Sequence, residues 1–175
     1  PLRVFAYDSS STGVSHAWYV NDVLFSTVQN PIFLFTNTGT TDSTVSIKLV
    51  ISASSGCQDS IVDSVVVYPQ PVGSFSLPTN ICETDSIPIT ASSSVAGSSF
   101  QWFSASSGVF IYNVNSPNTL VDFPPNQTGF DSTYTIGLAV SANGCTDTLY
   151  NNITISSRPI ARFNLPPAEC GPTII

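Results

Sequence analysis

Apolar and polar side chains alternate along much of the chain. From Tyr134 to Val140 every second residue is apolar or aromatic, and residues 43–51 alternate in the same way. Successive side chains of a strand point to opposite faces, so this pattern predicts strands with one buried face. Runs rich in β-branched residues predict strands at 65–68 and 153–155. Shorter strands are expected at residues 3–7, 15–20, 31–36, 87–91, 99–104 and 119–122, and no segment has a convincing helical period.

The sequence also repeats itself with a step of 88 residues. Gly-Cys-Gln-Asp at 56–59 recurs as Gly-Cys-Thr-Asp at 144–147, and Phe-Ser-Leu-Pro at 75–78 recurs as Phe-Asn-Leu-Pro at 163–166. Other landmarks recur at slightly shorter steps, which small differences in loop length explain. Three pieces are therefore expected: residues 1–70, a repeat that lacks its first strand; residues 71–158, a complete repeat; and residues 159–175, the start of a third.

Short linkers that contain proline, at residues 69–71 and 157–159, lie at the expected joints. Proline fixes φ and donates no hydrogen bond, so strands of neighbouring repeats cannot run on as one. The linkers are short enough to hold successive repeats end to end. Within each repeat, six or seven short strands separated by turn-forming residues predict a β-sandwich. The fold class is therefore all-β, with tandem immunoglobulin-like sandwiches of about 88 residues.

Composition narrows the classes of function. Hydrophobic residues make up 42% of the chain, enough for packed cores, whereas charged residues make up only 9%. Hydroxyl groups supply most of the polarity, through 28 Ser and 18 Thr. With four basic residues and a net charge of −7, the chain lacks the basic clusters that nucleic acids and anionic membranes require. No apolar run is long enough to be inserted in a membrane.

The four cysteines recur at the spacing of one repeat. We expect Cys82 to pair with Cys145, because Trp102 lies between them as in the Cys…Trp…Cys order of immunoglobulin-type domains. Such a bridge would contribute about 4 kcal/mol in the chain-entropy model. Cys57 and Cys170 would then pair outside this sequence, which is expected to belong to a longer chain; the alternative is a Cys57–Cys82 bridge across the joint. Disulfides indicate an exported protein, either secreted or at the cell surface.

The order of motifs resembles a known family. Each repeat begins with Pro-x-x-x-Phe, continues with a tryptophan strand at Trp18 or Trp102, and ends with Gly-Cys-x-Asp. This order resembles the PKD-like (polycystic-kidney-disease-type) repeats of large secreted or surface proteins of Bacteroidota-type bacteria. The residues after both tryptophans depart from that family's Trp-x-Phe-Gly-Asp-Gly pattern. The resemblance implies stalk or spacer repeats of an adhesin, motility filament or other surface appendage. Its partners would be neighbouring repeats, or further copies in a homo-oligomeric fibre.

Candidate sites for chemistry are few. His16 is the only histidine, so a catalytic triad or zinc cluster is not expected, and neither catalysis nor a required cofactor is predicted. A Cys82–Cys145 bridge would draw Glu83, Asp85 and Asp147 toward one end of the sandwich, where their oxygens could bind Ca²⁺. The alternative is that these three carboxylates are simply solvated.

Modification is a further possibility for this hydroxyl-rich surface. An Asp followed by Ser or Thr resembles the O-glycosylation acceptor of exported Bacteroidota proteins, although Asp-Ser also begins many turns. The six acceptors are Ser43, Ser60, Ser64, Ser86, Ser132 and Thr148. Asn126 and Asn152 begin Asn-x-Thr sequences, which matter only in a eukaryotic secretory route.

Three functions compete at this point. A stiff stalk is favoured. Direct binding of a glycan or a neighbouring cell would use the apolar runs at 32–35 and 109–112, although such runs usually pack inward. The third is an accessory module of a secreted enzyme.

Overall fold

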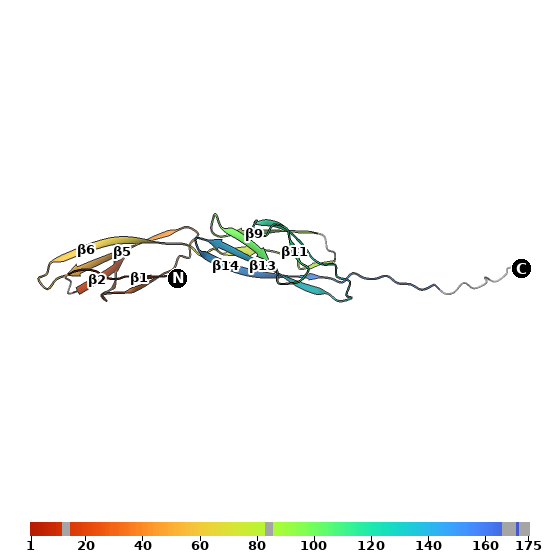
Figure 1. Cartoon of the computed structure of the whole chain (residues 1–175), viewed down its shortest axis with the longest axis horizontal. Helices are drawn as coiled ribbons and strands as arrows, with labels where there is room; N and C mark the ends of the chain where they lie inside the picture. The colour runs from red at the N-terminus through yellow and green to blue at the C-terminus, as the bar shows by residue number, and fades with distance from the viewer. Residues whose placement is uncertain (12–14, 83–85, 166–170, 172–175) are drawn as a thin grey trace.

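The computed structural model describes residues 1–11, 15–82, 86–165 and 171, and every regular element in these residues is a β-strand. The strands form two lobes that lie end to end (Figure 1). The N-terminal lobe (residues 1–68) contains β1 (Leu2–Phe5), β2 (Ser15–Val20), β3 (Val23–Ser26), β4 (Ile32–Phe35), β5 (Ser43–Ser52) and β6 (Gln58–Val67). The C-terminal lobe (residues 71–157) contains β7 (Gly73–Phe75), β8 (Asn80–Ile81), β9 (Ile87–Ser93), β10 (Ser99–Phe103), β11 (Phe110–Ile111), β12 (Asn118–Asp122), β13 (Ser132–Ala142) and β14 (Cys145–Ile155). The predicted all-β fold is confirmed. None of the described residues belongs to a helix that could cross a membrane.

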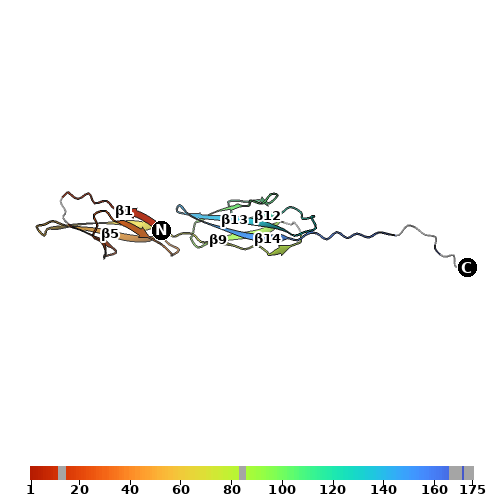
Figure 2. The same cartoon turned by 90° about the horizontal axis from the view of Figure 1, so that it is seen from below.

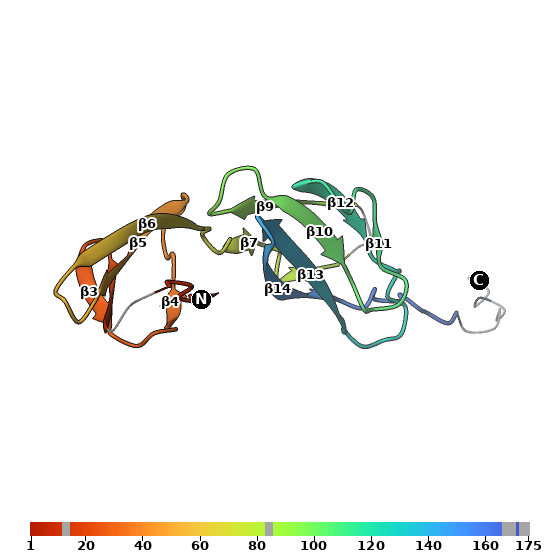
Figure 3. The ribbon, with the colours of Figure 1, turned by 60° about the vertical axis from the view of Figure 1, so that its left-hand side comes forward.

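Each lobe is a sandwich of two sheets (Figures 2 and 3). In the C-terminal lobe the sheet β10-β13-β14-β8 packs against the sheet β11-β12-β9-β7. In the N-terminal lobe the sheet β3-β2-β5-β6 packs against the pair β1-β4. Strands β2, β5 and β6 hold the places of β10, β13 and β14, and the pair β1-β4 holds the place of β9-β12. The two lobes therefore share the order of these strands, but β3 pairs with β2 whereas β11 pairs with β12 in the opposite sheet.

The cores of the two lobes differ in size. Among the described residues, the N-terminal core has three buried members, Trp18, Phe33 and Leu49. The C-terminal core has ten buried members, drawn from both of its sheets: Ile89, Ala91, Trp102, Val121, Phe123, Ile136, Leu138, Val140, Ile153 and Ile155. Since burial of apolar surface is the main stabilising contribution to folding, we expect the C-terminal lobe to be the more stable of the two.

Residues 71–81, which we call the bridging segment, account for much of this difference. Its first part, β7, pairs antiparallel with β9, and its second part, β8, pairs parallel with the end of β14 in the opposite sheet. The ring of Phe75 stands edge-on to Trp102 at 4.9 Å between centroids, and Leu77 and Ile81 also pack against the core. The bridging segment thus joins both sheets and covers the core between them.

The described residues of the N-terminal lobe contain no counterpart of the bridging segment. Ile61 on β6 is 69% exposed, whereas Leu149, at the same place on β14, is half-buried. Leu2 is likewise exposed where its counterpart Ile87 is half-buried. The indole N–H of Trp18 is buried without a hydrogen-bond partner, whereas that of Trp102 donates to Ser116 O at 2.8 Å. The N-terminal sandwich is therefore open along one edge.

One side-chain amide braces each lobe. The Nδ2 of Asn126 donates to the carbonyl oxygens of Phe130 and Ile155, at 2.7 and 2.8 Å. Asn37 makes the corresponding bonds to Thr41 O and Val67 O, both at 2.8 Å. Each amide thus joins the loop before the lobe's longest antiparallel strand pair (β5–β6 or β13–β14) to the last residue of that pair. Asn126 is 6% exposed and uses both of its amide protons, so its Asn-x-Thr sequence is not a usable acceptor for a glycan.

The substitution Asn126→Ala should destabilise the C-terminal lobe by about 2 to 3 kcal/mol, because it removes both hydrogen bonds of a buried amide, including the buried one to Ile155 O. Asn152→Ala is the matched control: Asn152 is exposed and only accepts a hydrogen bond from Thr135, so its loss should cost about 0.5 kcal/mol or less. The indole N–H signals of Trp18 and Trp102, one in each lobe, would follow the two unfolding transitions separately by NMR in denaturant. Equal shifts for the two variants would contradict the bracing role.

Candidate binding groove of the N-terminal lobe

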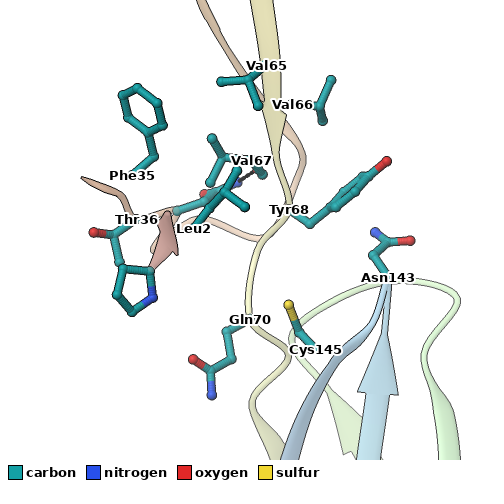
Figure 4. A pocket seen from close by; sticks show the side chains of 12 residues that line it. Leu2, Phe35, Thr36, Val65, Val66, Val67, Tyr68, Gln70, Asn143 and Cys145 are labelled. Carbon is teal, nitrogen blue, oxygen red and sulfur yellow. Dashed lines mark hydrogen bonds between the residues drawn. The ribbon is translucent and has the colours of Figure 1, made fainter. Parts of the chain in front are cut away.

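The open edge of the N-terminal lobe forms a groove of about 460 Å³ beside the joint (Figure 4). Its walls come from the ends of β1, β4 and β6, and its floor near the joint comes from the linker and from the β13–β14 turn of the other lobe. The lining residues are Pro1, Leu2, Phe35, Thr36, Asn37, Val65, Val66, Val67, Tyr68, Gln70, Asn143 and Cys145.

The apolar wall of the groove has a clear counterpart in the C-terminal lobe. Phe35 and Val65 are half-buried here, whereas the residues at their places, Val121 and Ile153, are fully buried. In the C-terminal lobe this region is covered by Leu77 and Ile81 of the bridging segment. The groove is therefore the place that the second half of a bridging segment would fill.

A smaller hollow of about 50 Å³ lies further along β6, bounded in part by Ile51, Asp59 and Ile61. At the same place in the other lobe, the Oδ2 of Asp147 accepts a hydrogen bond from the backbone N–H of Gly73 at 2.9 Å. Asp59 is exposed and has no such partner among the described residues. Groove and hollow together follow the course that β7 and β8 take in the C-terminal lobe.

A polar network adjoins this hollow. The carboxylate of Asp8 accepts hydrogen bonds from the hydroxyl and backbone N–H of Ser10 and lies 2.7 Å from Nε2 of His16. These bonds, those of Ser10 first, lower the pKa of Asp8 to about 2. The side chain of His16 is 15% exposed, and among the described residues its polar partner is this carboxylate, so His16 is a packed residue of β2.

The predicted disulfide is not formed, and the positions of the two cysteines explain why. Cys82 directly follows Ile81, which pairs with Ile155 at the end of β14, whereas Cys145 begins β14. Ten residues of strand separate these places by roughly 33 Å, far more than the ~5.5 Å that a disulfide allows between Cα atoms. Cys82 and Cys145 are both free, so the prediction was wrong.

Cys57 forms no disulfide with a described residue either. Cys57 is free and exposed at the hairpin between β5 and β6, the end of the N-terminal lobe remote from the joint. The alternative Cys57–Cys82 bridge within one chain is therefore also wrong. Cys170 lies outside the described residues. Cys145 follows the tight Asn143-Gly144 turn, whose residues have φ of 49° and 79°, and its sulfur faces the joint near Gln70 (Figure 4).

Asp147 is the one predicted calcium ligand that lies among the described residues. Glu83 and Asp85 lie outside the described residues, and within the described residues no group of three or more His, Cys, Asp or Glu could hold a metal. Asp147 lies eight residues along β14 from Ile155, the partner of Ile81, which is roughly 26 Å of strand. Its carboxylate instead holds the N–H of Gly73. A calcium site shared with Glu83 and Asp85 stays a prediction.

The apolar runs considered for binding are each divided between core and surface. Phe33 is fully buried while its neighbours Ile32 and Leu34 are exposed. In the second run, Phe110 and Tyr112 are exposed and contact each other edge-on at 4.9 Å. The Tyr112 hydroxyl donates to Asp122, which raises the pKa of Tyr112. Hydrogen bonds from Ser86 and Tyr112, in that order, lower the pKa of Asp122. Half of each run is therefore core, as strand alternation requires.

Sequence reasoning did not find the groove or the two bracing asparagines. The sequence did hold a sign of the bracing role. Asn37 precedes Ser43 at the start of β5 as Asn126 precedes Ser132 at the start of β13, so the asparagine recurs at the same place in both repeats. The alternation of apolar and polar residues within either lobe does not indicate the groove. It is visible only where one lobe is compared with the other.

Comparisons with known proteins give distant likenesses in fold only. No protein-family model matches the sequence, and no curated protein matches it. The fibronectin(III)-like modules of Clostridium thermocellum CbhA align over 93% of this chain and 91% of that chain, at 13% identity and a TM-score of 0.38. Murine CEACAM1b aligns over 89% and 92%, at 14% identity and a TM-score of 0.35.

Extracellular cadherin domains 3–6 of protocadherin gamma B2 align over 89% of this chain, at 10% identity and a TM-score of 0.37. The chain spans only 47% of that protocadherin structure. At TM-scores this low, none of these proteins assigns the chain to a family.

The Asp8 network should make the N-terminal lobe sensitive to acid. Because the pKa of Asp8 is about 2 in the folded chain and 3.8 ordinarily, the carboxylate stabilises the lobe fully above pH ~4 and loses this effect as the pH falls toward 2. Asp8→Asn should lower stability at pH 5, and its difference from the unsubstituted chain should shrink toward pH 2. Denaturant unfolding of the Trp18 signal over this pH range checks the point. A difference that does not change with pH would rule it out.

Proposed function

We propose that the chain is a pair of structural repeats from the stalk of a large extracellular adhesin, filament or surface appendage. In this proposal the repeats meet at residues 70/71 and 158/159, and they belong to the PKD-like type of Bacteroidota-like bacteria. The observation that carries the proposal is the joint between the lobes. Pro69 and Pro71 are both less than 2% exposed, so the linker is packed rather than free.

A packed proline linker stiffens the joint in two ways. Each proline ring fixes φ, which removes backbone freedom from the three-residue connection. Burial of the rings means that any bending of the joint would have to expose apolar surface to water. Both effects favour a stiff rod that holds something at a distance, the role that a stalk performs.

Direct binding is the less favoured function. The two apolar runs that would serve it bury half of their side chains in the cores, and the exposed remainder is divided between the two lobes. An accessory role beside an enzyme domain would draw on the same stiffness, and the proposed rod is compatible with it.

Pulsed electron resonance would test the stiffness. With Cys145→Ser and Cys170→Ser, spin labels on exposed Cys57 and Cys82 report the length of both lobes, roughly 70 Å from the lengths of β6 and β14. We expect one narrow distance distribution, because the joint is packed. Pro69→Gly with Pro71→Gly should broaden it, whereas Pro159→Gly, at an exposed proline outside both lobes, should not. A broad distribution in the chain that keeps all its prolines would refute the rod.

We also propose that the Asp-Ser and Asp-Thr acceptors carry O-glycans in the native host. Ser43, Ser60, Ser64, Ser86 and Thr148 are exposed and Ser132 is half-buried, so the acceptor hydroxyls lie at or near the surface. The intact mass of the protein from its host should exceed that of the bare polypeptide by whole sugar units. A mass equal to the polypeptide would exclude the modification.

A further inference from the structure

We propose that the outward face of strands β10, β13 and β14 in the C-terminal lobe binds a neutral, extended polysaccharide. In this site the ring of Tyr150 packs against the sugar rings, and neighbouring hydroxyl and amide groups bond to the sugar hydroxyls. The inference goes beyond the stalk role and does not depend on it, because the stiffness of the joint and the binding of a polysaccharide are measured separately. Neither of the two apolar runs contributes to this face.

Strand alternation places polar, uncharged side chains on this face. Strands β10, β13 and β14 lie side by side (Figure 3), and the buried residues Trp102, Leu138 and Ile153 mark their inward positions. The residues between the inward ones form what we call the hydroxyl face: Ser99, Gln101 and Phe103 on β10; Thr133, Thr135, Gly137, Ala139 and Ser141 on β13; and Thr146, Thr148, Tyr150, Asn152 and Thr154 on β14. None of these side chains is charged at neutral pH, in a chain whose net charge is −7.

One aromatic ring in the middle of the hydroxyl face is accessible. Tyr150 is 61% exposed and stands edge-on to Phe103, with 5.6 Å between the ring centroids. Phe103 lies over Gly137, where a Cβ would come within 2.3 Å of the phenylalanine ring. Gly137 thus makes room for Phe103, which in turn supports Tyr150. A supported, exposed ring suits a sugar, because the C–H groups of a sugar carry a slight positive charge and pack against the negative face of an aromatic ring.

Hydrogen bonds between strands hold the polar side chains on both sides of Tyr150. On one side, Thr135 Oγ1 donates to Asn152 Oδ1 at 2.8 Å. On the other side, the hydroxyls of Ser141 and Thr146 lie 2.8 Å apart. Side chains that their neighbours already hold lose little conformational freedom when a ligand binds, and each hydroxyl can still make a further hydrogen bond. The hydroxyl face therefore offers fixed donors and acceptors along the length of β14.

The charge and the length of the hydroxyl face select the class of ligand. An anionic polysaccharide is repelled by a chain with a net charge of −7, whereas a neutral one is not. Strands β13 and β14 have 11 residues each, so the face extends for roughly 36 Å. Such a length accommodates several sugars of an extended chain in a row. A neutral polysaccharide with an extended backbone meets both conditions.

A second copy of the chain fits the hydroxyl face less well. The buried centres of protein–protein interfaces are rich in aromatic and other large apolar side chains and poor in serine. Among the residues of the hydroxyl face, Tyr150 is the only exposed large hydrophobic side chain. The remaining exposed groups are hydroxyls and amides, which a polyhydroxylated ligand can match one by one.

The corresponding face of the N-terminal lobe has a different centre. Lys48 stands at the place of Gly137, and Val62 stands at the place of Tyr150. The ammonium group of Lys48 lies 5.9 Å from the ring centroid of Tyr19, the aromatic residue of β2. The exposed ring supported over a glycine is therefore a feature of the C-terminal lobe, and the proposed site belongs to that lobe.

Native electrophoresis in gels cast with a soluble polysaccharide tests the proposal, because a protein that binds the polysaccharide migrates more slowly. Hydroxyethylcellulose is the neutral probe, and carboxymethylcellulose presents the same backbone with negative charges. The full chain is made in a host that does not glycosylate it, since Thr148 of the hydroxyl face is one of the proposed acceptors. We expect hydroxyethylcellulose to slow the unsubstituted chain and carboxymethylcellulose to leave its migration unchanged.

Substitutions at two exposed tyrosines locate the site. Tyr150→Ala should weaken binding of hydroxyethylcellulose about tenfold or more, because the ring that packs against the sugars is lost, whereas Tyr150→Phe should retain binding. Tyr112→Ala is the matched control: Tyr112 is 51% exposed on the opposite sheet, and its loss should leave binding unchanged. The indole N–H signal of Trp102 by NMR shows whether the C-terminal lobe of each variant is folded.

Several results would overturn the proposal. One is equal migration of the unsubstituted chain with and without hydroxyethylcellulose, and another is equal slowing by the neutral and the anionic probe. Equal losses for the folded Tyr150→Ala and Tyr112→Ala variants would remove the site from the hydroxyl face. Sedimentation velocity in reducing agent, without polysaccharide, should show a monomer; dimers that Tyr150→Ala abolishes would assign the face to a second copy instead.

Discussion

Two sheets packed face to face leave their core open to water along both sides unless some stretch of chain covers it. In the C-terminal lobe that stretch is the bridging segment, which pairs with a strand of each sheet and places Phe75 against Trp102. The N-terminal lobe shares the order of the main strands but has no such segment among the residues that the structure describes, and its core is smaller. The difference in the number of buried core residues between the lobes thus indicates how much a covered edge adds to the burial of apolar surface.

Sequence pattern was sufficient for the long strands and insufficient for the short ones. Period-two alternation located β5 and β13, and residues 15–20 match β2. Strands β6 and β14 are longer than expected, because polar residues in their first parts (Asp and Ser in β6, Thr and Asp in β14) conceal the alternation, while the hydrogen-bonded pairing with β5 and β13 still holds both strands. Strand β8 has two residues, too few for an alternation of apolar and polar side chains to be recognised. Its existence depends on a parallel pairing with residues more than seventy positions away.

The wrong disulfide has the same origin. A repeat step says which cysteines are equivalent, but it does not say at which end of the sandwich each one lies. The neighbour of Cys82 in space is set by the pairing of Ile81 with Ile155, which no local spacing records. The bracing amides were missed for a related reason: the sequence marked Asn126 only as the start of an Asn-x-Thr motif, and its bonds to Phe130 and Ile155 show it as part of the interior.

The parallel pairing of β8 with β14 has a mechanical meaning. Strand β8 follows β7 at the beginning of the C-terminal lobe and β14 is its last strand, and the chain enters and leaves the lobe at opposite ends. A pull on the two ends of the molecule therefore slides β8 along β14, so that the bonds from Thr154 and Ser156 are strained together rather than opened one after another. Resistance to force then depends on the rate at which this ladder yields, a kinetic property distinct from the free energy of unfolding.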